Sequence, residues 1–127
     1  MKILRKVLLS KSDYPISYYD DEVDFTFYTM NGWKETVVLS LSTSQPLKNL
    51  VEQQGISYES LAKQGIARLS DLSSKEKQYF YRYMIVEDLK YVDVKYLIVF
   101  GFVEHREYYD CQVFGVLEVE HKGGDPS

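Results

Sequence analysis

Cysteine and histidine are scarce in this sequence. Cys111 is the only cysteine, so no disulfide can form within the chain, and we expect a cytoplasmic protein. A lone cysteine commonly packs as a small buried hydrophobe. The two histidines, His105 and His121, belong to no His-x-x-x-His or Cys-x-x-Cys spacing. The sequence therefore predicts neither a metal site nor a catalytic thiol.

Long apolar runs are also missing. The longest run, Tyr96 to Val103, has the length of a strand, whereas a bilayer span needs roughly 20 residues. Residues 2–6, Lys-Ile-Leu-Arg-Lys, are interrupted by charge where a secretory signal needs an apolar stretch. We expect no signal peptide and no membrane partner.

Recognisable catalytic and nucleotide-binding motifs are lacking. There is no Gly-x-Ser-x-Gly elbow, and the seven glycines are scattered instead of forming a phosphate-binding loop. The net charge of -4 provides no basic excess for coating nucleic acid. These absences favour a non-enzymatic protein without cofactors.

Tyrosine is abundant, with twelve copies in 127 residues. Its ring is rigid and amphipathic, and it is enriched at protein interfaces. The length suits one domain with a real core, which we place at residues 1–122, followed by a frayed tail at 123–127.

The clearest local pattern is a hairpin. Residues 23–30 and 33–42 are rich in β-branched and aromatic side chains, and Asn31-Gly32 between them favours a type I′ turn. Apolar groups occur on both faces of this hairpin, which indicates cover on both sides or contact with another subunit. Residues 2–10 are expected to form an earlier strand.

The middle of the chain has helical periodicity. We expect a helix capped by Ser44 and ended by Gly55, and a second one from Ser57 to Gly65. Ser73 and Glu76 form a capping-box pattern that predicts a longer helix over residues 75–89.

The last third returns to strands at residues 92–102 and 111–119, with a turn near 104–107 and one core face. Strands and helices are thus segregated along the chain. This order predicts an α+β protein with an antiparallel sheet of about five strands and two or three helices on one face.

An acidic and aromatic cluster is the candidate partner-binding site. Carboxylates attract a basic surface, and tyrosines add rigid contact area at low entropic cost. The residues of this cluster are Tyr14, Tyr18, Tyr19, Asp20, Asp21, Glu22 and Asp24. They predict a protein partner with a basic surface, and self-association as a homodimer is an open alternative.

Two other activities remain open from the sequence. Residues 47–72 resemble a helix-turn-helix in spacing, with Lys48, Lys63 and Arg68 as basic groups for nucleic acid. Asp93 and Lys95 begin a hydrophobic strand as an acid-x-Lys element, which in a metal-dependent nuclease could hold Mg²⁺. The favoured hypothesis is a protein-binding module of the inhibitor, immunity or viral accessory type.

Overall fold

The computed structural model describes residues 1–9, 22–29, 31–66, 79–88, 93–104 and 106–120. These residues contain seven strands and two short helices. In chain order they are β1 (Lys2–Val7), β2 (Glu22–Tyr28), β3 (Lys34–Ser40), β4 (Gln45–Pro46), α1 (Leu47–Gln54), α2 (Tyr58–Lys63), β5 (Tyr79–Glu87), β6 (Val94–Glu104) and β7 (Tyr109–Glu120).

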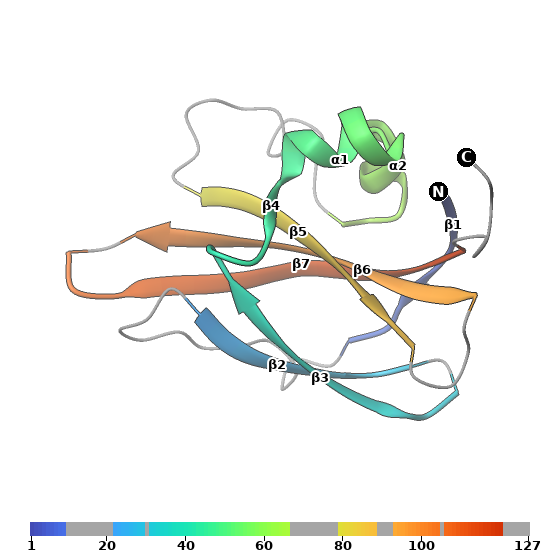
Figure 1. Ribbon diagram of the computed structural model, residues 1–127, viewed down its shortest axis with the longest axis horizontal. Helices are drawn as coiled ribbons and strands as arrows, with labels where there is room; N and C mark the ends of the chain where they lie inside the picture. The colour runs from blue at the N-terminus through green and yellow to red at the C-terminus, as the bar shows by residue number, and fades with distance from the viewer. Residues whose placement is uncertain (10–21, 30, 67–78, 89–92, 105, 121–127) are drawn as a thin grey trace.

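The elements stack in three layers. The middle layer is an antiparallel sheet with the strand order β1-β7-β6-β5-β4. Helices α1 and α2 cover one face, and the β2–β3 hairpin covers the other (Figure 1). Two hydrophobic cores result, one on each face of the sheet. This arrangement fits the predicted α+β class.

The finer prediction is matched only in part. A five-stranded antiparallel sheet with two helices on one face is present, but among the described strands β2 and β3 pair with each other and form a second sheet that lies across it. The hairpin buries one face, through Phe25, Phe27 and Leu39, and leaves the other exposed.

The helix expected over residues 75–89 is also wrong where it can be assessed. Residues 79–87 form β5, which pairs along its length with β6; residues 75–78 lie outside the described residues. The run Tyr-Phe-Tyr-Arg-Tyr-Met-Ile-Val contains residues that favour strands. Because both faces of β5 are covered, its apolar residues show no alternation that would reveal a strand.

The return strand β7 has two core faces instead of the predicted one. Val99 pairs with Gly115 and Phe100 with Val113, so Phe114 is an extra residue at a bulge. Beyond the bulge, the side chains that point to a given face of the sheet are shifted by one position along β7. Cys111 and Val113 face the hairpin, whereas Leu117 and Val119 beyond the bulge face the helices.

The hairpin turn lies where it was predicted but differs in type. Thr29 N–H donates to Trp33 O at 2.8 Å, and Gly32 N–H donates to Thr29 O at 2.9 Å. Gly32 has a φ of 82°, but Asn31 does not have a positive φ. A type I′ turn needs positive φ at both positions, so the turn is of another type, with a left-handed glycine at Gly32.

The two helices are held mainly by packing. Leu47, Leu50 and Leu61 are buried against the sheet. Gly55 ends α1 and Ser57 caps α2, as predicted. Ser44 does not cap α1, because it lies in the turn before β4. Within the described residues, no helix is long and apolar enough to cross a membrane.

Candidate functional site

The exposed side of the β2–β3 hairpin is the candidate site. Strand alternation places every second side chain there, away from the sheet. We call this surface the outer hairpin face; it consists of Glu22, Asp24, Thr26, Tyr28, Lys34, Thr36 and Val38.

Apolar and acidic groups adjoin on the outer hairpin face. Tyr28 is 54% exposed and Val38 is 47% exposed, and Trp33 at the turn is 44% exposed. Asp24 is the cross-strand partner of Val38. The face thus offers Val38 beside the Asp24 carboxylate and, toward the turn, the Tyr28 ring beside Lys34, a combination of apolar and charged groups that suits a protein partner.

The inner side of the hairpin holds this face in place. Phe25 and Phe27 stack with ring centroids 5.7 Å apart, and Phe27 meets the edge of the Tyr96 ring at 5.3 Å. All three residues are at most 1% exposed. Burial of such side chains contributes about 1.5–3 kcal/mol each, so the hairpin is firmly attached to the sheet.

Arg82 fastens the end of the hairpin where β3 leads into β4. Its Nη2 donates to Leu41 O at 2.9 Å and to Ser44 O at 2.6 Å, and its Nε donates to Ser44 Oγ at 2.9 Å. Burial lowers the pKa of Arg82. The guanidinium of this β5 residue therefore donates to carbonyl groups at the end of the hairpin and so joins the two elements.

A buried polar cluster lies against the inner side of the hairpin. Tyr96, whose ring contacts Phe27, donates its OH to Asp88 Oδ2 at 2.7 Å. Burial, with a further contribution from Asp88, raises the pKa of Tyr96. Burial followed by the charge of Asp88 raises the pKa of Glu35 on β3.

The predicted binding residues divide into two groups. Glu22 and Asp24 are exposed on the outer hairpin face. The other five, Tyr14, Tyr18, Tyr19, Asp20 and Asp21, lie outside the described residues.

Sequence reasoning missed three exposed residues of the same hairpin: Tyr28, Trp33 and Val38. The signal available was the period-two alternation, which puts Tyr28 on the same face as Asp24. It was obscured because both faces of the hairpin contain apolar residues.

The two helices of the helix-turn-helix alternative are packed against the sheet. Both helices bury leucines against the sheet, and residues 67–72 lie outside the described residues. Lys63 is paired with Glu59 on the same helix at 3.7 Å, and Lys48 is exposed on α1.

The residues considered for the acid-x-Lys alternative are divided between the two faces of the sheet. Asp93 is exposed before β6, and Lys95 Nζ lies 3.5 Å from Glu87 Oε1. Asp88 accepts a hydrogen bond from Tyr96 on the hairpin side of the sheet. Lys95 is next to Tyr96 on β6, so its side chain points to the other face. Among the residues described, no group of three or more His, Cys, Asp or Glu side chains could hold a metal ion.

Cys111 is buried, as predicted. Burial raises the pKa of its thiol to about 12, which keeps the thiol protonated at neutral pH.

Comparison of the chain with protein-family models, curated proteins and solved structures gives no match.

Proposed function

We propose that this chain is a non-enzymatic, cytoplasmic protein-binding module of the inhibitor, immunity or accessory type, which binds a basic surface of its partner through the outer hairpin face. The observation that carries this proposal is the exposure of Tyr28, Trp33 and Val38 on a hairpin whose outer face also carries Glu22 and Asp24. Aromatic side chains supply much of the binding affinity at protein interfaces, and charged groups speed the encounter with a partner.

The contacts that hold the hairpin against the sheet support the same proposal. A surface that is already held by the Arg82 hydrogen bonds at one end and by the contact of Phe27 with Tyr96 toward the other loses little conformational entropy on binding. Such preorganisation is characteristic of tight inhibitor-like contacts.

The outer hairpin face is too small to form the interface alone. Seven residues of strand extend about 24 Å, and two strands are about 10 Å wide, which gives roughly 240 Å². A standard interface buries about 800 Å² on each partner. We propose that the acidic and aromatic residues 14–21, which precede β2 in the chain, supply further contact area.

The test compares three baits in a nuclease-treated native lysate: the parent protein, Glu22→Lys with Asp24→Lys, and Glu52→Lys with Glu59→Lys. The second pair is a matched control, because it makes the same charge change on α1 and α2 in the opposite layer. We expect the parent and the control to retain one stoichiometric protein that the hairpin variant loses. Equal capture by all three baits would place the interface elsewhere.

A further inference from the structure

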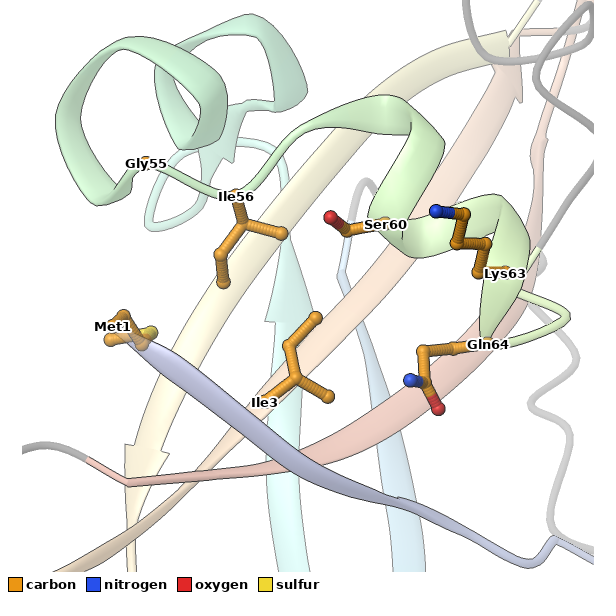
Figure 2. Close-up of a pocket in the computed structure, with 7 residues that line it drawn as sticks. All are labelled: Met1, Ile3, Gly55, Ile56, Ser60, Lys63 and Gln64. Atoms are coloured by element: carbon orange, nitrogen blue, oxygen red, sulfur yellow. The ribbon is translucent and has the colours of Figure 1, made fainter.

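A pocket of about 280 Å³ lies between β1 and the segment that connects α1 to α2 (Figure 2). It is in the helix layer, on the other side of the sheet from the outer hairpin face. A function of this pocket is therefore independent of the proposed protein-binding function.

One side of the pocket is apolar. Ile3 from β1 and Ile56 from the helix connection point toward each other across the space (Figure 2). Ile56 is only 3% exposed, so most of the apolar surface open to a ligand comes from Ile3 and Met1, which pack partly against the helix-side core. These side chains can take up a short hydrocarbon chain.

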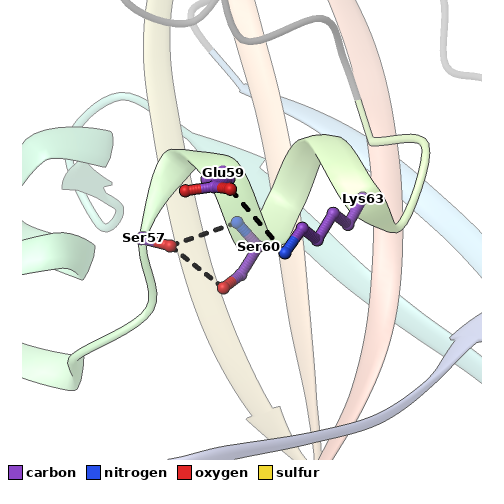
Figure 3. Close-up of polar contacts among 4 residues, drawn as sticks. All are labelled: Ser57, Glu59, Ser60 and Lys63. Carbon is purple, nitrogen blue, oxygen red and sulfur yellow. Dashed lines mark hydrogen bonds and ion pairs between the residues drawn. The ribbon is translucent and has the colours of Figure 1, made fainter.

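The other side is polar and comes from α2 and its end. Ser60, Lys63 and Gln64 follow i, i+3, i+4 spacing, so they lie on one side of the helical turn. The Ser60 hydroxyl is 3.0 Å from Ser57 Oγ (Figure 3), and a hydroxyl in that contact retains further hydrogen-bonding capacity. A ligand oxygen would find a hydroxyl, an amide and an ammonium group here.

Lys63 is available to a ligand. Its Nζ is 3.7 Å from Glu59 Oε1 (Figure 3), and the two side chains are 74% and 70% exposed. An exposed ion pair of this kind contributes little to stability, so Lys63 can readily exchange Glu59 for a ligand. On the neighbouring side, Lys6 Nζ donates to Gly65 O at 3.3 Å and so ties β1 to the end of α2.

We propose that this pocket binds a small aliphatic carboxylate, with its chain against Ile3 and Met1 and its carboxylate at Ser60, Lys63 and Gln64. The described lining residues include one cationic side chain, Lys63, which is also paired with the nearby Glu59, so the site suits a monoanion better than a phosphate dianion. The volume is at the lower limit for ligand pockets, so the chain must be short.

The test is an NMR titration of the full protein with butanoate, hexanoate and octanoate, with hexan-1-ol as the uncharged probe. We expect shifts of Ile3, Ile56 and Ser60, and an affinity that rises roughly fourfold per methylene until the pocket is filled. Hexan-1-ol should bind more weakly than hexanoate. Equal binding of the two, or shifts confined to other residues, would overturn the proposal.

Two lysine variants provide a matched comparison. Lys63→Gln should weaken hexanoate binding up to about fivefold and leave hexan-1-ol unchanged, whereas Lys48→Gln on α1 should change neither. Equal effects of the two variants would contradict a carboxylate site at Lys63. Ser60→Leu should fill the pocket and abolish binding, and if that variant does not fold, the lysine pair still decides.

Discussion

At the residue scale, Gly115 on β7 occupies a position where a side chain has no room. A Cβ atom there would lie 2.1 Å from Ile66 Cδ1, and Ile66 is itself 2% exposed. We predict that Gly115→Ala destabilises the protein by about 1–3 kcal/mol, because the core must shift to accommodate a methyl group. Urea denaturation would measure the loss.

Ile66 supplies the control for this prediction. Ile66→Val removes the Cδ1 atom that the new methyl group would meet. The double variant Gly115→Ala with Ile66→Val should therefore be more stable than the sum of the two single changes implies. A strictly additive result would show that Ile66 does not limit the space at Gly115.

The Cys111 thiol leads to a second prediction at this scale. Its pKa is raised from 9.0 to about 12 by burial, so the unfolded chain releases this proton at a lower pH than the folded protein does. The free energy of unfolding should consequently fall as the pH rises from about 9 toward 12, by up to about 1.4 kcal/mol per pH unit from this group.

Chemical denaturation across that pH range would test the thiol's contribution. In Cys111→Ala the contribution is missing, so the parent should lose stability relative to the variant as the pH rises. Parallel pH profiles of the two proteins would contradict a shielded thiol.

At the element scale, Arg82 is the group that joins the hairpin to β5. Arg82→Met removes its three hydrogen bonds to Leu41 and Ser44 and leaves carbonyl groups without that donor. We predict a loss of about 3 kcal/mol, because hydrogen bonds to charged groups are worth about 1.5–3 kcal/mol each and part is recovered by solvation.

Hydrogen exchange would show where this loss acts. Amides of β3 and of residues 41–44 should exchange faster, while β6 and β7 keep their protection. Arg106→Met is the control, since Arg106 is exposed between β6 and β7. Uniform loss of protection across the protein would mean that Arg82 stabilises the whole fold and not the hairpin attachment.

The elements differ in how far their sequences determine them. The β2–β3 hairpin was predictable because Asn31-Gly32 is flanked by strand-forming residues. β5 was not, because Ser73 and Glu76 provide a local helix signal, and pairing with β6 outweighs it. The bulge at Phe114 has no local signal, which explains the error in the faces of β7.

At the scale of the whole molecule, the layering was the hardest feature to foresee. Attachment of the hairpin to the sheet depends on contacts such as Phe27 with Tyr96, which are far apart in the chain. Glu22 and Asp24 were predicted as binding residues from composition alone. Tyr28 joins them only when strand pairing fixes which side chains share the exposed face.

The layering also separates two surfaces by the thickness of the molecule. The outer hairpin face combines Glu22 and Asp24 with Tyr28 and Lys34, and the pocket beside Ile3 is in the helix layer. Occupation of one surface therefore leaves the other accessible, and the two proposals can be tested on the same protein.

Photo-crosslinking from the outer hairpin face tests the proposed function most directly. A photoreactive phenylalanine analogue would replace Tyr28 in one protein and Glu52 on α1 in another, because both positions are exposed but lie in opposite layers. We predict one defined crosslinked partner from position 28 and none from position 52. A crosslink from position 52 alone would contradict binding through the outer hairpin face.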